Sequence, residues 1–214
     1  MSIRLIGLFL CIICSIDLCA ISILLDPAGD ATTPGRLIGD TYERTCMQQL
    51  AQELKNALEK KGHTVVLSRL PGEKISQKEK AQLANQCTVD MVLRLQAYHC
   101  AKVTPQLHIF YYDTHEMYAT RTTPHVLSYN KAHTLHHKES KGYAQALYEQ
   151  LHQDHYARFL CAHEPIGMPC VALKGIVPPA LSIECGMQRS SDWHFLVQPL
   201  TEVLHTCIQN LSTQ

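Results

Sequence analysis

The chain lacks a net charge: its 214 residues contain 19 Lys and Arg and 19 Asp and Glu. Without a basic or acidic excess, no long-range field attracts it to nucleic acid or to an anionic membrane, and we expect no nucleic-acid partner. Apolar residues make up 46% and charged residues 18%, a balance that excludes a disordered chain. The length is that of one ordinary domain with a substantial core.

The sequence also lacks an apolar run long enough to cross a bilayer, which takes about 20 residues. The longest such run extends from Leu5 to Ile16 and is ended by Asp17. This length is typical of a signal peptide. We therefore expect residues 1–20 to be a signal peptide or an N-terminal hydrophobic segment that makes any membrane contact. The expected location is outside the cytoplasm, in the periplasm, in the cell envelope or beyond. The alternative is a buried first strand that continues into residues 21–25.

No Cys-x-x-Cys pair occurs after residue 20, so a cysteine-ligated zinc ribbon has no support. Seven cysteines remain beyond that point, an odd number that leaves at least one free thiol. Cys161 and Cys170 bracket a loop that contains proline and glycine, and they form the best candidate for a local disulfide.

Alternating apolar segments predict the fold. Met47, Leu50, Leu54 and Leu58 recur at three- and four-residue steps, which is typical of an amphipathic helix. Helices are predicted over 42–61, 76–86, 139–153 and 192–211, the last interrupted at Pro199. Strands are predicted over 21–25, 65–67, 91–95, 107–112 and 180–184, and the histidine-rich stretch 113–137 reads as a long loop.

Strands separated by helices favour an α/β class, with a mainly parallel twisted sheet and helices on both faces. No internal repeat or linker divides the chain. We therefore expect residues 21–214 to form a single domain.

Six short segments then stand in an order that resembles one protein family. They are Asp26-Pro27-Ala28-Gly29-Asp30; Glu43 at the start of a helix; Gly62, Val65, Ser68 and Arg69; Ala84, Asn85 and Asp90; Arg94-Leu95-Gln96-Ala97-Tyr98; and Pro179-Ala180-Leu181-Ser182-Ile183-Glu184-Cys185-Gly186. This series resembles the zinc-dependent N-acetylmuramoyl-L-alanine amidases, which cut peptidoglycan and have a phosphorylase/hydrolase-like fold. The resemblance runs from about residue 21 to residue 211.

The resemblance implies a zinc site, but this sequence departs from it at two positions. In the family, two histidines and one glutamate hold zinc, and a second glutamate on the C-terminal strand is the general base. By position, Glu43 matches the ligand glutamate and Glu184 the catalytic one. Gly29 and Gln96 stand where the histidines belong; glycine has no side chain, and a neutral amide is a poor zinc donor. The resemblance therefore implies a site that has lost its metal.

Three hypotheses follow. The leading one is an exported amidase-like protein that needs no cofactor, has lost or strongly weakened hydrolase activity, and binds peptidoglycan or a cell-wall protein partner. The second is an active amidase whose zinc site is rebuilt from Asp30, Glu43 and a downstream histidine, His99 or His108. The third is an exported α/β binding domain unrelated to amidases, whose motif matches are accidental.

Overall fold

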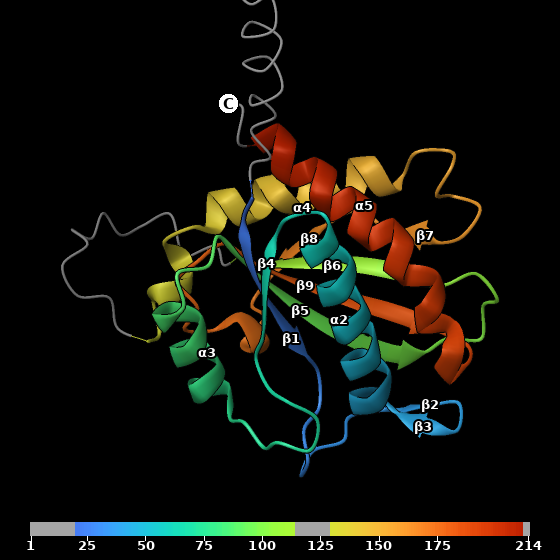
Figure 1. The fold of residues 1–214 in the computed structure, drawn as a ribbon, viewed down its shortest axis with the longest axis horizontal. Coiled ribbons are helices and arrows are strands. Elements are labelled where there is room, and N and C mark those ends of the chain that lie inside the picture. The colour runs from blue at the N-terminus through green and yellow to red at the C-terminus, as the bar shows by residue number, and fades with distance from the viewer. Residues whose placement is uncertain (1–19, 114–128, 212–214) are drawn as a thin grey trace, which may run out of the picture.

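A computed structural model describes residues 20–113 and 129–211, and its centre is a seven-stranded sheet (Figure 1). The sheet has the order β4-β1-β5-β9-β6-β7, with β8 also paired to β6. The strands are β1 (Ser22–Pro27), β4 (Thr64–Leu67), β5 (Met91–His99), β6 (Gln106–Tyr112), β7 (Cys161–Ala162), β8 (Ile166–Met168) and β9 (Ala180–Met187), and a separate hairpin joins β2 (Leu37–Ile38) to β3 (Thr41–Tyr42). The helices are α2 (Glu43–Lys60), α3 (Gln77–Gln86), α4 (His137–Leu151) and α5 (His194–Leu211), with 3-10 turns η2 (Ala132–Thr134), η3 (Val171–Leu173) and η4 (Ser190–Trp193).

The strand directions confirm the predicted mainly parallel sheet. β1 is parallel to β4 and β5, and β5 is parallel to β9. Only β6 opposes its neighbour β9, and β7 and β8 then pair with β6 in parallel. The carboxyl ends of β1, β5 and β9 therefore meet at one edge of the sheet, where ligand sites of open α/β sheets form.

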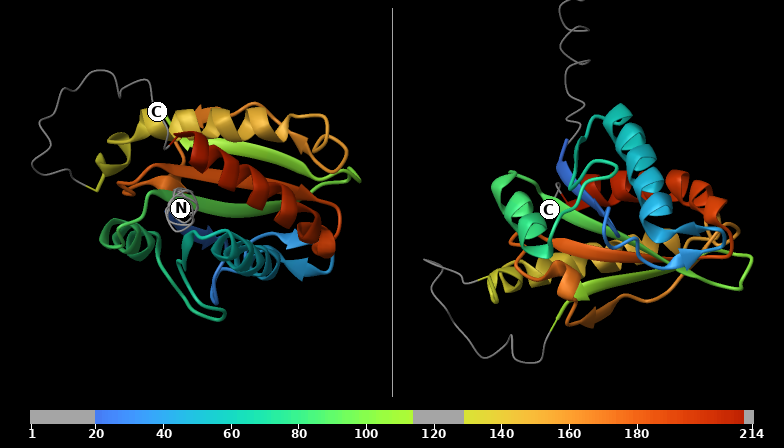
Figure 2. Two further views of the ribbon diagram at one scale, coloured as in Figure 1. Left: turned by 45° about the horizontal axis from the view of Figure 1, so that its top comes forward. Right: turned by 90° about the horizontal axis from the view of Figure 1, so that it is seen from below.

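The two faces of the sheet are covered unequally. Side chains alternate along each strand, so Leu25, Leu93 and Ile183 share one face and pack against α2, α4 and α5 in the large core. The opposite face carries Leu24 and Val92, which pack with α3 and η3 in a smaller cluster. Figure 2 shows α3 apart from the other helices. Helices on both faces of the sheet are thus confirmed. On the face where α3 packs, the helix covers only part of the sheet, and polar side chains occupy the rest.

Three predicted boundaries are wrong. β5 and β9 extend to His99 and Met187, beyond the predicted ends at 95 and 184, because they pair along eight register positions. Pro199 does not interrupt the last helix, which is continuous through it. Leu196 and Leu200, on either side of the proline, are fully buried in the core, and this packing outweighs the lost backbone hydrogen bond.

The predicted disulfide is also absent: Cys161 and Cys170 are free thiols, as are the other cysteines of the described residues. The physical reason is the path of the chain. Cys161 pairs with Gln106 at the start of β6, whereas Met168 pairs with Tyr112 at its end. The segment between them is laid out along the length of β6, which keeps the two cysteines apart.

No helix in residues 20–113 and 129–211 has the length and apolar character needed to cross a bilayer. The predicted N-terminal signal segment and most of the histidine-rich stretch lie outside the described residues.

A buried charge cluster ties α3 to the sheet. The Asp26 carboxylate on β1 contacts Lys80 Nζ of α3 at 2.8 Å, accepts a hydrogen bond from Ser68 Oγ at 2.5 Å, and pairs with Arg94 of β5. Burial by itself would raise the pKa of Asp26, but the charges of Arg94 and Lys80 outweigh it and leave the pKa below its ordinary value. The Asp26 carboxylate is thus the shared partner of two buried cations, Lys80 and Arg94.

We predict that Asp26→Asn lowers the free energy of unfolding by about 3–5 kcal/mol, because it leaves buried cations without their partner. Urea denaturation monitored by circular dichroism measures the change. The matched control is Glu59→Gln, which breaks the exposed Lys55–Glu59 pair of α2 and costs about 0.5 kcal/mol. Equal losses in the two variants would contradict the structural role of Asp26.

Candidate functional site

Glu43, the first residue of α2, lies at the carboxyl edge of the sheet with 5% of its surface exposed. Its Oε1 accepts a hydrogen bond from the backbone N–H of Ala97 at 2.8 Å, and its Oε2 accepts one from the backbone N–H of Arg36 at 3.1 Å. The positive end of the helix dipole also favours the carboxylate here. Both carboxylate oxygens therefore already have backbone partners.

Glu184, on β9, is joined to the same place by Arg36. The Arg36 Nη1 lies 2.5 Å from Glu184 Oε1 and donates a second, longer bond of 3.4 Å to the Ala97 carbonyl. The hydrogen bond that Arg36 donates to Glu184 is the largest cause of a raised Arg36 pKa, followed, after an opposing effect of burial, by the charges of Glu184 and Glu43. The carboxyl edge thus has its own permanent cation, a guanidinium that contacts Glu184 and feels the charge of Glu43.

The two positions expected to hold histidines are filled differently. Gln96 is the register partner of Glu184, and its Nε2 donates to Ser182 Oγ at 2.7 Å. Gly29 has a φ of +70°, and a Cβ built on it would lie 2.6 Å from the Cβ of Arg44. The backbone and the neighbouring helix therefore leave no room for a side chain at position 29.

Two of the predicted replacement zinc ligands, Asp30 and His99, do not join Glu43. Asp30 Oδ1 accepts hydrogen bonds from the backbone N–H groups of Thr32 and Thr33, at 2.8 and 2.6 Å, and the bond from Thr33 is the main reason that its pKa falls to about 2. His99 is exposed at the end of β5. Strand alternation places it on the face opposite Gln96.

His108 alone among these candidates adjoins Glu184, its register partner across β6 and β9. Its Nε2 lies 3.1 Å from the Tyr98 hydroxyl, and its ring stacks on His163 with centroids 4.2 Å apart. Burial, and then the charge of His163, lower the pKa of His108. His108 thus belongs to a half-buried polar and aromatic row beside the glutamate.

This set of residues does not fit a catalytic zinc ion. Within residues 20–113 and 129–211, no three His, Cys, Asp or Glu side chains are grouped so that they could hold a metal. A catalytic zinc needs three protein ligands and an open position. Here one ligand position has no space for a side chain and one holds an amide, so that Glu43, with one backbone N–H on each carboxylate oxygen, remains as the single family ligand.

Sequence reasoning missed Arg36, Tyr98 and His163. Arg36 stands in a loop rich in glycine and proline, with no periodicity or motif to single it out. A signal existed only for Tyr98, which alternation places on the same face as Gln96 at the end of the motif strand.

The fold, with Arg36, Glu43 and Glu184 at the carboxyl edge of its sheet, is that of an α/β domain of the amidase type. The sequence profile of the Amidase_3 family, described as N-acetylmuramoyl-L-alanine amidase, matches residues 23–199. The chain therefore belongs to the N-acetylmuramoyl-L-alanine amidase family. This finding excludes the third hypothesis, that of accidental motif matches. No curated protein matches the sequence.

Solved structures of amidases share the fold at low sequence identity. An N-acetylmuramoyl-L-alanine amidase from Clostridium difficile 630 is 19% identical with a TM-score of 0.63, covering 91% of this chain and 98% of its own. Ami1 from Mycobacterium smegmatis is 12% identical with a TM-score of 0.63, covering 89% and 97%. The CwlD amidase from Clostridioides difficile, in complex with the GerS lipoprotein, is 15% identical with a TM-score of 0.59, covering 91% and 100%.

The crowding at Gly29 is directly testable against a matched position. Gly29 and Gly72 both have a positive φ, +70° and +82°, but nothing lies within 4 Å of a Cβ built on Gly72. Both alanine variants bear the left-handed backbone penalty of about 1–2 kcal/mol. We predict that Gly29→Ala loses about 1–3 kcal/mol more than Gly72→Ala in urea denaturation, because it also clashes with Arg44. Equal losses would show that position 29 accepts a side chain.

Proposed function

We propose that this chain is an exported amidase-like protein of the cell wall that binds peptidoglycan without zinc-dependent hydrolysis. The observation that carries the proposal is Arg36, whose guanidinium contacts Glu184 and lies beside Glu43. Family membership supports the wall as its place of action. Glu43 is then a helix-start carboxylate that anchors the Arg36 loop, and Glu184 orients the guanidinium.

The chemistry of a guanidinium supports binding rather than catalysis. It is always charged, donates hydrogen bonds in a planar fork, and has no free coordination position. It therefore cannot hold a water molecule as a Lewis acid or lower the pKa of that water, as a catalytic zinc does. It can still donate to the carbonyl, hydroxyl and carboxylate oxygens in which glycan–peptide strands are rich.

The surroundings of Arg36 offer further contacts for such a ligand. The Arg36 side chain is 54% exposed, so its fork is within reach of a bound molecule. Tyr98, His108 and Phe110 are half-buried, and strand register places them on the face of Glu184. Aromatic rings and hydrogen-bonding groups on one surface suit sugars and peptides alike.

A protein partner is the second candidate. Leu37 is 57% and Tyr42 47% exposed on the β2–β3 hairpin, which follows Arg36 directly. The CwlD structure contains a lipoprotein partner. An exposed apolar pair beside Arg36 would give a protein partner a hydrophobic contact.

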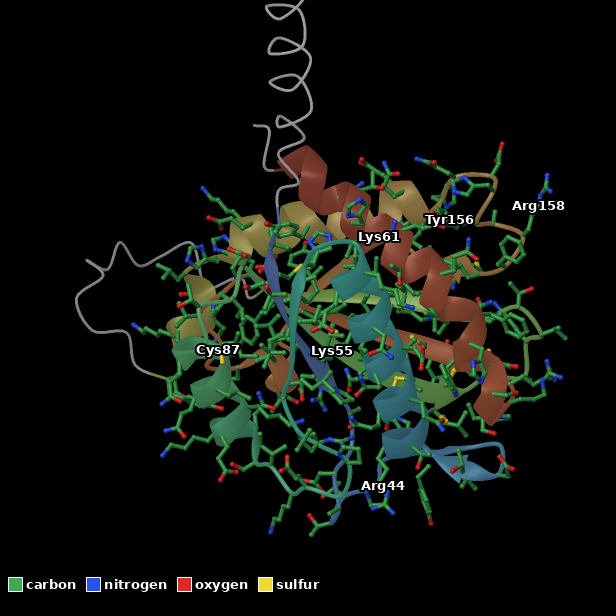
Figure 3. The ribbon with its side chains drawn as sticks, viewed as in Figure 1. Arg44, Lys55, Lys61, Cys87, Tyr156 and Arg158 are labelled. Atoms are coloured by element: carbon green, nitrogen blue, oxygen red, sulfur yellow. The ribbon has the colours of Figure 1, made fainter. Side chains whose placement is uncertain are left out.

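Zinc content and wall binding, measured together, test the proposal. The full chain, purified without a metal-binding tag, is expected to hold far less than one zinc per molecule by plasma mass spectrometry. We expect it to sediment with insoluble peptidoglycan and to release no dye from labelled peptidoglycan. Arg36→Gln should weaken retention about tenfold, the loss of one charge-assisted contact. The control Arg158→Gln changes an exposed arginine that lies far from Arg44 and the N-terminal end of α2 (Figure 3), and should leave retention unchanged.

Two outcomes would overturn the proposal. One zinc per chain that disappears in Glu43→Ala, together with dye release, would establish the rebuilt zinc site of an active amidase. Absence of sedimentation with peptidoglycan would remove the wall as the ligand and leave the protein partner as the remaining candidate.

A further inference from the structure

A cavity whose lining includes neither Arg36 nor Glu184 opens beside α2. Its volume is about 400 Å³, and it lies between the first turns of α2 and the two loops that follow β1 and β4. Cavities of this size hold small ligands. Its principal polar side chains are those of Arg44, Gln48 and Arg69, and Asp30 stands at its rim. Figure 3 shows Arg44 at the N-terminal end of α2, away from Lys55 and Lys61.

Gln48 contributes an amide without partners. It is 9% exposed, and both its Nε2 and its Oε1 are buried with no hydrogen-bond partner among the described residues. A buried amide that makes no hydrogen bond is costly and rare in folded proteins. Gln48 lines the cavity, so a change of its side-chain rotamer on binding would let a molecule there satisfy its donor and its acceptor together.

Two guanidinium groups flank this amide with a surplus of positive charge. Arg69 is 4% exposed, donates to the Ala28 carbonyl at 3.2 Å, and keeps an unpartnered Nε within the described structure. Arg44 Nη1 donates only to the carbonyls of Asp30 and Ala31, each at 3.2 Å. The ion pairs of the described residues include neither arginine.

Neither of the two carboxylates that act on Arg69 pairs with these arginines, because Asp26 is paired with Lys80 and Arg94. Asp30 turns its Oδ1 to the Thr32 and Thr33 backbone of its own loop. Burial is the main cause of a lowered Arg69 pKa; the charges of Asp26 and Asp30 oppose the shift, and those of Arg94 and Arg44 add to it. The cavity therefore has positive charge that no carboxylate of the described residues pairs with. The planar guanidinium groups of Arg44 and Arg69 match the geometry of a carboxylate.

We propose that this cavity binds the carboxyl end of a short peptide. The carboxylate pairs with Arg44 and Arg69, and the peptide N–H beside it donates to Gln48 Oε1, while Gln48 Nε2 donates to a ligand oxygen. This site is separate from the Arg36 and Glu184 side chains of the proposed function and does not depend on that function. The requirement for a donor beside the anion distinguishes a peptide end from a bare inorganic anion.

Isothermal titration calorimetry of the full chain tests this proposal with N-acetyl-alanyl-alanine as the probe. We expect saturable binding of the dipeptide, none of its C-terminal amide, and weaker binding of inorganic phosphate. Saturation by the amide, tighter binding of phosphate, or no binding of the dipeptide would each overturn the proposal. These comparisons use wild-type protein and do not depend on the folding of any variant.

Gln48→Leu separates a ligand role from a structural one. Leucine keeps the buried volume and removes both unpartnered polar atoms, so stability should be unchanged or higher. Affinity for the dipeptide should fall about thirtyfold, the effect of the two hydrogen bonds that Gln48 makes with the ligand. Gln52→Leu, on the same helix outside the cavity, is the control and should bind normally. A destabilised Gln48→Leu protein would show that the fold already satisfies the amide and would overturn the proposal.

Discussion

The contact of the Arg36 guanidinium with Glu184 and the Ala97 carbonyl is the interaction on which the candidate site depends. It connects the loop after β1 to β5 and β9, three segments far apart in the sequence. The backbone N–H of the same residue also binds Glu43, so one arginine fixes both glutamates. A carboxylate pair at the carboxyl edge of a sheet needs a cation or solvent nearby. Here the chain supplies that cation itself.

This arrangement explains how the two glutamates can persist without the histidines. Glu43 has a structural role, because it satisfies two backbone donors and begins α2. Glu184 has an electrostatic role opposite Arg36. Membership of the amidase family is therefore compatible with side chains at these positions that hold no metal. A fold does not by itself determine an activity.

Much of the scaffold could be predicted from sequence because it rests on periodicity and local capping. The α2 pattern around Leu50 and Leu54 and the capping box of Ser76 and Glu79 place their helices within a residue or two. Prediction failed where tertiary contacts decide: at Pro199, which the core packing overrides, and at Cys161, which a strand pairing carries away from Cys170. Arg36 could not be found for the same reason, because its partners lie 61 and 148 residues along the chain.

A crystal structure grown with excess zinc, with anomalous difference maps at the zinc edge, tests the central claim most directly. The account predicts Arg36 on Glu184 and no anomalous peak between Glu43 and Glu184. An anomalous peak about 2.0–2.2 Å from the Glu43 carboxylate, with Arg36 displaced from Glu184, would contradict it.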